Sequence, residues 1–86
     1  MDTRVALLSI IVEPGGEIEK MNDLLHEAAP FIIGRMGIPY RKCNINIISI
    51  AIDAPQDIIA ALSGKLGRLT GVTIKTMYSN VITKAE

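Results

Sequence analysis

The sequence has little cysteine, few aromatic side chains and no net charge. Its single cysteine, Cys43, has no second thiol in the chain to pair with, which excludes a small secreted domain held by internal disulfides. Tryptophan is missing, and the nine basic residues equal the nine acidic ones in number. Binding to nucleic acid through general electrostatic attraction needs a surplus of lysine and arginine, so we expect no direct nucleic-acid binding.

Long apolar runs and targeting signals are also missing. The longest uncharged stretch covers residues 43–52, whereas a membrane span needs roughly 18–20 apolar residues. No signal-peptide pattern is visible at the start of the sequence, so we expect a cytoplasmic protein with no membrane partner. Hydrophobic residues nevertheless make up 49% of the 86 residues, and the mean hydropathy is +0.35. This composition excludes a disordered chain and predicts one small domain.

Buried strands are predicted from two apolar runs, Val5–Val12 and Ile45–Ile52. In both runs the apolar side chains occupy odd and even positions alike. A strand that is covered on one face only would alternate with polar residues, so both runs are predicted to be central strands. A third run, Phe31–Tyr40, is interrupted by glycine and Pro39 and predicts an edge strand. The alternating run Val72–Ser79 predicts a half-exposed strand.

Two amphipathic helices are predicted between these strands. The first covers Glu17–Ala29 and ends at Pro30. The second begins at Asp53, which forms a capping-box pattern with Gln56, and ends near Gly67. The order strand, helix, strand, strand, helix, strand predicts an α+β fold, the ferredoxin-like βαββαβ plait. In it a four-stranded antiparallel sheet carries both helices on one face. We expect a single domain over residues 1–80 and a weakly ordered C-terminal tail over residues 81–86.

This fold leaves one face of the sheet without helices. Both predicted central strands carry apolar side chains on both faces, so the uncovered face is predicted to expose several of them. Large exposed apolar patches mark interaction surfaces. The sequence therefore predicts a homo-oligomer, either a dimer or a tetramer, that buries this face or its edge.

The first candidate binding site is the turn formed by Pro14, Gly15 and Gly16, between the first strand and the first helix. Glycine lets a backbone approach a ligand closely, and a helix N-terminus offers free N–H groups to an anion. The alternative is a tight turn with no ligand. The patterns of dinucleotide-binding and phosphate-binding loops are not present in the sequence.

The second candidate site is the edge strand with Arg35, Tyr40 and Arg41. The planar guanidinium of arginine suits a carboxylate or a phosphate, which favours an anion-binding edge. The alternative is an edge that charge and proline protect against pairing with another chain.

His26 and Cys43 are the candidate metal ligands or nucleophiles. His26 is predicted near the end of the first helix, where an imidazolium also gains from the helix dipole. Cys43 follows two cations that would lower the pKa of a thiol, or it is simply a small side chain in a turn. A closed metal site usually has four ligands, so these two residues would have to be shared between subunits. No nucleophile is paired with a base in the sequence pattern, so we predict no catalytic residues and no enzymatic activity.

Several segments resemble a known family of small stand-alone proteins, the iron-only hydrogenase system regulators. The resemblance runs from about residue 4 to residue 79, and GRMGIPYR and ALSGKLG are its most specific parts. The segments that carry it are Leu24–Glu27, Gly34–Arg41, Ala61–Gly67, Gly71–Val72 and Lys75–Thr76. The resemblance implies an ACT-like, ferredoxin-type fold akin to the regulatory domain of nickel-responsive repressors. The family has no agreed catalytic residues, so none is transferred.

The resemblance also implies a regulatory, non-enzymatic role. ACT-type domains often bind small effectors, typically amino acids, at subunit interfaces near the first strand–helix loop, which here is residues 14–16. The nickel-responsive relatives hold metal through His and Cys at a tetramer interface. The alternative function is therefore a nickel, zinc or iron sensor with His26 and Cys43 as inter-subunit ligands. The sequence leaves the identity of any cofactor unknown. A regulator without an element that reads DNA would act through a protein partner or by sensing an effector.

Overall fold

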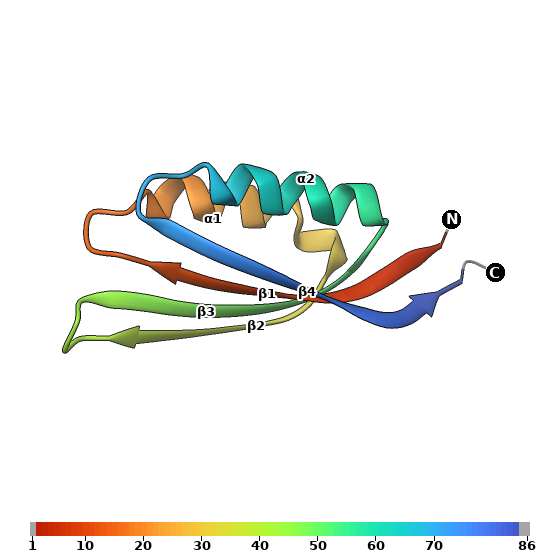
Figure 1. Ribbon diagram of the computed structural model, residues 1–86, viewed down its shortest axis with the longest axis horizontal. Helices are drawn as coiled ribbons and strands as arrows, with labels where there is room; N and C mark the ends of the chain where they lie inside the picture. Colours follow the sequence, from red (N-terminus) through yellow and green to blue (C-terminus); the bar gives the residue numbers. More distant parts are fainter. Residues whose placement is uncertain (1, 85–86) are drawn as a thin grey trace.

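The computed structural model describes residues 2–84, which form four strands, two α-helices and one 3₁₀ turn (Figure 1). Along the chain these elements are β1 (Thr3–Val12), α1 (Ile18–Glu27), η1 (Ala29–Phe31), β2 (Ile32–Tyr40), β3 (Ile45–Ala54), α2 (Gln56–Gly67) and β4 (Val72–Thr83). The described residues contain no helix that is long and apolar enough to cross a membrane.

The four strands form one sheet in the order β2-β3-β1-β4, and every neighbouring pair is antiparallel. Both helices lie on the same face of this sheet (Figure 1). The predicted ferredoxin-like α+β fold is confirmed. The two runs that are apolar on both faces, β1 and β3, occupy the centre, and the glycine- and proline-containing strand β2 lies at one edge.

The hydrophobic core lies between the sheet and the helices. Alternate residues of β1 and β3 point toward the helices and are almost fully buried, as are the apolar stripes of α1 and α2. The largest fully buried side chains are Leu8, Ile10, Met21, Leu25, Ile50, Ile52, Ile59 and Leu66. Full burial of each such side chain stabilises the fold by about 1.5–3 kcal/mol, so this one layer holds the helices on the sheet.

Helix α2 begins later than the capping pattern predicts. It starts at Gln56, whereas Asp53 belongs to β3 and accepts a hydrogen bond from the Thr83 hydroxyl at 2.9 Å. The predicted capping box is therefore wrong. The reason is Pro55, which disfavours helical dihedrals at the residue before it and so keeps Ala54 in the strand. The first helix is also shorter than predicted, because residues 29–31 turn as a 3₁₀ helix around Pro30.

Strand β4 extends beyond the segment that the alternation predicts. It pairs with β1 as far as Thr83, and Ile82 lies opposite Arg4. The predicted weakly ordered tail is therefore wrong for residues 81–83, while residues 85 and 86 lie outside the described residues. The register shifts between Arg4 and Ala6, and such a bulge breaks the period of two from which a strand is recognised.

Candidate functional site

The β1–α1 loop, which holds the first candidate site, is joined to the α2–β4 loop by backbone hydrogen bonds. The Glu13 N–H donates to the Gly71 carbonyl at 2.8 Å, and the Glu17 N–H donates to the Thr70 carbonyl at 3.0 Å. In return, the Thr70 N–H donates to the Glu17 carboxylate at 2.8 Å. The two loops thus close one end of the layer between helices and sheet.

The glycines of these loops have a structural explanation. Gly15 and Gly71 have positive φ angles of 79° and 70°, which non-glycine residues rarely adopt. A Cβ on Gly16 would lie 2.7 Å from Cγ1 of Val12 and 2.9 Å from the Gly71 carbonyl oxygen. A Cβ on Gly71 would lie 2.7 Å from Cα of Gly16. The tight turn and the contact between the loops therefore account for glycine at these positions.

Two N–H groups around the start of α1 are engaged within the loop that precedes it. Gly16 donates to the Glu13 carbonyl at 2.9 Å, and Ile18 donates to the Gly16 carbonyl at 2.9 Å. An anion at a helix N-terminus needs such groups to be free. Ligand binding by Pro14, Gly15 and Gly16 stays a prediction, and the geometry of the loop itself favours the alternative of a turn without ligand.

The Glu17 carboxylate is the charged group that links the β1–α1 loop to the α2–β4 loop. It lies 2.9 Å from the Lys20 ammonium and accepts the hydrogen bond from Thr70. The contact with Lys20, followed by the hydrogen bond from Thr70, holds the pKa of Glu17 below its ordinary value. The same contact raises the pKa of Lys20.

The three residues of the second candidate site are not brought together. Arg35 lies opposite the buried Ile50 and so points to the helix side of the sheet, whereas Tyr40 lies opposite Ile45 on the other face. Arg41 lies in the exposed turn that follows β2. The edge position of β2 is confirmed, but an anion site that combines these three side chains is not formed within one chain.

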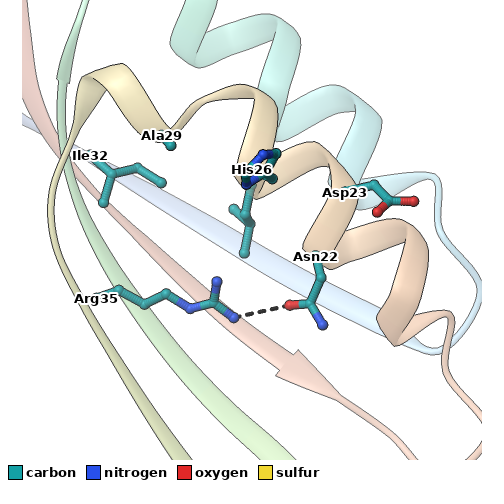
Figure 2. Close-up of a pocket in the computed structure, with 7 residues that line it drawn as sticks. Asn22, Asp23, His26, Ala29, Ile32 and Arg35 are labelled. Atoms are coloured by element: carbon teal, nitrogen blue, oxygen red, sulfur yellow. Dashed lines mark hydrogen bonds between the residues drawn. The ribbon is translucent and has the colours of Figure 1, made fainter.

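Arg35 instead reaches toward α1. Its guanidinium Nη2 donates a hydrogen bond to Oδ1 of Asn22 at 3.0 Å (Figure 2). Around this contact is a groove of about 560 Å³ between α1, η1 and the start of β2. We call it the α1–β2 groove. It is lined by Asn22, Asp23, Leu25, His26, Ala29, Ile32 and Arg35.

The α1–β2 groove combines residues that the sequence analysis named for separate reasons. His26 was a candidate for a metal or the helix dipole, and Arg35 was a candidate for an anion at the edge. Asn22 was not singled out, although it lies one turn before His26 on the same helix, and residues at that spacing share a face. This spacing, together with an arginine on the strand that follows the helix, is the sequence pattern that indicates a shared groove.

The structure separates the two candidate metal ligands. His26 lines the groove beside Ile32, the first residue of β2, whereas Cys43 lies exposed in the turn after Tyr40, the last residue of β2. A strand of nine residues spans about 26 Å from end to end. Across residues 2–84 no three His, Cys, Asp or Glu side chains are placed to hold a metal ion. A metal site would need ligands from another copy and stays a prediction.

The face of the sheet opposite the helices, which we call the open face, exposes large apolar side chains as predicted. The register aligns Ile38, Ile47 and Ile11 in one row across three strands, and Leu7 lies beside Met77 in another. Exposure ranges from 37% at Leu7 to 62% at Met77. Between the rows is a shallow hollow of about 220 Å³. The residues that define the open face are Leu7, Ile11, Met36, Ile38, Ile47 and Met77.

Comparisons with known proteins agree with this geometry. The family model "TM1266-like: Iron-only hydrogenase system regulator, putative" matches residues 4–76. The structure of the uncharacterized protein TM1266 from Thermotoga maritima is similar, with 39% identity and a TM-score of 0.85. The match covers 88% of this chain and 96% of that one.

A second structure shares only the fold. This is a formyltetrahydrofolate deformylase from Pseudomonas putida KT2440, with 14% identity and a TM-score of 0.63 over 90% of this chain and 29% of the deformylase. No protein with a curated description matches significantly. The model that spans residues 4–76 and the TM1266 structure both point to one family. This chain belongs to the TM1266-like family of iron-only hydrogenase system regulators.

Proposed function

We propose that this chain is a non-enzymatic regulatory module that acts as a homo-oligomer, with the open faces of two copies packed against each other. It would respond to a small effector, such as an amino acid, or to a protein partner. The observation that carries the proposal is the open face, because Ile38, Ile47 and Ile11 form an exposed apolar row across three strands. Leu7 and Met77 form a second exposed pair on the same face. The description of the family as a regulator supports the non-enzymatic role.

The size and charge of the open face fit a second copy. A four-stranded face nine residues long covers roughly 600 Å², and two such faces would bury about 1,200 Å² in total. Stable interfaces begin at about this size. In the central rows the charged side chain is Lys75, which lies on the edge strand β4. A long lysine stem at an edge can lie along apolar surface and keep its ammonium in water.

The compartment and the mode of action follow from the same proposal. We place the module in the cytoplasm, because its single thiol, Cys43, is exposed and unpaired and so fits a reducing compartment. With no DNA-reading element expected from the sequence, regulation would proceed through the oligomer and whatever it binds.

The test is the molar mass in solution, measured by light scattering after size exclusion at about 10 μM. We expect the unaltered protein to be a dimer or a tetramer and Ile47→Lys to be a monomer with a normal circular dichroism spectrum. Ile58→Lys is the matched control, because Ile58 on α2 has the same 37% exposure as Ile47 but lies on the helix side. A monomeric unaltered protein, or equal effects of both variants, would contradict the proposal.

A further inference from the structure

We propose that the α1–β2 groove binds a small carboxylate that has a short apolar stem. The carboxylate would be held by Arg35 and Asn22, and the stem would lie on the apolar wall of the groove. This inference deepens the proposed function, on which it rests for its regulatory meaning, because it names a ligand class and a site away from the β1–α1 loop.

The first argument is the uncompensated charge of Arg35. Within residues 2–84, its hydrogen-bond partner is the neutral amide of Asn22, and no carboxylate lies within ion-pair distance. A guanidinium carries five N–H donors, of which this contact uses one. The remaining donors form the planar fork that matches a carboxylate in two-point contact. Arg35 is therefore oriented by the protein while most of its donors are left for a ligand.

Asn22 supplies the second donor. Its Oδ1 accepts the hydrogen bond from Arg35, which fixes the orientation of the amide and leaves the Nδ2 group as a donor. Within residues 2–84, the side-chain hydrogen bond of Asn22 is the one that its Oδ1 accepts. Figure 2 shows Oδ1 of Asn22 facing Arg35 and the Nδ2 group on the far side of that oxygen, so one cationic and one neutral donor group flank it between α1 and β2. This arrangement suits a carboxylate, which only accepts hydrogen bonds.

The wall of the α1–β2 groove argues for an apolar stem on the ligand. Ala29 and Ile32 supply its accessible apolar surface, since Leu25 also lines the groove but is almost fully buried, and Ile32 packs against the hydrophobic core. A wholly polar anion such as phosphate would leave this wall in contact with water. His26 also lines the groove, one turn beyond Asn22, and its imidazole N–H is a further donor for an anion.

One acidic residue lines the same groove. Figure 2 shows the carboxylate of Asp23 directed away from Arg35, on the other side of Asn22. Its charge is therefore not placed to neutralise the guanidinium. The end of the groove near β2 is the cationic end, and that is where the carboxylate of the ligand would lie.

The test is a titration of the ¹⁵N-labelled protein with 3-methylbutanoate, followed by two-dimensional NMR. We expect saturable shifts of the Asn22 side-chain amide and of the backbone amides around His26 and Arg35. The neutral isostere 3-methylbutanamide has the same shape without the charge and should shift none of them. Inorganic phosphate, which lacks the apolar stem, should bind at least 10-fold more weakly than 3-methylbutanoate.

Variants connect the binding to the fork of Arg35. Arg35→Gln should weaken binding of 3-methylbutanoate at least 10-fold, although its amide can still donate to Asn22 and preserve the link between strand and helix. Arg35→Lys keeps the charge but lacks the planar fork. It should bind 3-methylbutanoate more weakly than the unaltered protein and more tightly than Arg35→Gln. Arg41→Gln is the matched control, because it removes the same charge from the exposed turn outside the groove.

Three results would overturn the inference. They are unchanged binding in Arg35→Gln, equal binding of the neutral amide, and phosphate binding as tight as that of 3-methylbutanoate. The light-scattering measurement separates this inference from the proposed function. A monomer that still binds 3-methylbutanoate through Arg35 contradicts only the assembly, whereas an oligomer that binds nothing in the groove contradicts only the carboxylate site.

Discussion

The two faces of the sheet both carry large apolar side chains but have different surroundings. In β1, Leu8 is fully buried beneath the helices, while its neighbour Leu7 is 37% exposed on the open face. The same contrast holds in β3 between Ile50 and Ile47. Residue type therefore does not decide which face is covered within one chain. The open face carries large apolar side chains on either side of a more polar row that contains Ser49, Ser9 and Lys75. This exposed apolar surface is the physical reason to look for a second layer over it.

Truncation of two neighbouring leucines gives the largest expected contrast. Leu8→Ala should lower the free energy of unfolding by about 2–5 kcal/mol, because it opens a cavity in the packed core. In a single chain that is not packed against another copy, Leu7→Ala should lower the free energy of unfolding by less than about half as much. Urea unfolding, monitored by circular dichroism at two protein concentrations, measures both effects. If both variants lose the same free energy of unfolding at low protein concentration, the two faces do not differ in how much they stabilise a single chain.

Two glycines differ in the space around them in the same way: Gly71 is crowded, and Gly34 is open. Gly71→Ala should destabilise the protein by about 2 kcal/mol or more, since a positive φ costs an L-residue about 1–2 kcal/mol. The added Cβ would also meet Cα of Gly16 at 2.7 Å. Thermal unfolding of the variant measures the loss. A variant as stable as the unaltered protein would show that the two loops do not hold this end of the helix layer.

Gly34, at the edge of the open face, is the contrasting position. A Cβ here meets no atom within 4 Å, so Gly34→Ala should raise the stability of a single chain by about 0.4–1 kcal/mol through the entropy of the unfolded state. If the open faces pack together, the extra methyl group should weaken association instead. The dissociation constant from analytical ultracentrifugation decides this. Unchanged association would place Gly34 outside the interface.

The smallest expected effect concerns Glu17, which joins the two loops that close the covered side. Its pKa is lowered in the folded state, so its stabilisation is present above the unfolded value near 4.5 and is lost as the pH falls through the folded value. Glu17→Gln should therefore be less stable than the unaltered protein at pH 7 and equally stable in strong acid.

Glu19→Gln is the control for this prediction. It removes the same charge from the first turn of α1, where the structure gives the carboxylate no hydrogen bond among residues 2–84. Urea midpoints measured from pH 7 down to pH 2 give the difference between the two variants. A loss at pH 7 that persists at pH 2 would mean that Glu17 acts through packing, not through its charge.

The sequence determines the covered face and its order of elements well, because the apolar periodicity changes at each boundary. It misplaces the end of α1, and it also misplaces the start of α2 and the end of β4, which are wrong for a shared reason. The pair Asp53 and Gln56 fits a helix cap, but Pro55 between them keeps the chain extended. The strand after Tyr78 contains a bulge, so alternation no longer reports it. In both cases the backbone geometry, set by a proline or a bulge, differs from the one that the residue pattern predicts.

The candidate site is harder to predict than the fold. Arg35 and His26 were recognisable as polar residues of interest, but nothing periodic places them in one groove with Asn22. Their convergence depends on η1, the turn around Pro30 that sends the chain back beneath α1. The glycines at 15 and 16 were ambiguous for a similar reason. Their partner, Gly71, lies far along the chain, and sequence spacing does not reveal a contact of that kind.

The strand order determines when the sheet can form fully during synthesis. The first strand, β1, lies between β3 and β4, and β4 is the fourth of these strands along the chain. The ladder between Thr3 and Thr83, and the contact of Glu13 with Gly71, therefore join the two ends of the fold (Figure 1). Pairing between such distant segments is slow to form because a long loop must close. Until β4 has left the ribosome, the outer edge of β1 is unpaired, and an unpaired strand edge is open to pairing with another chain.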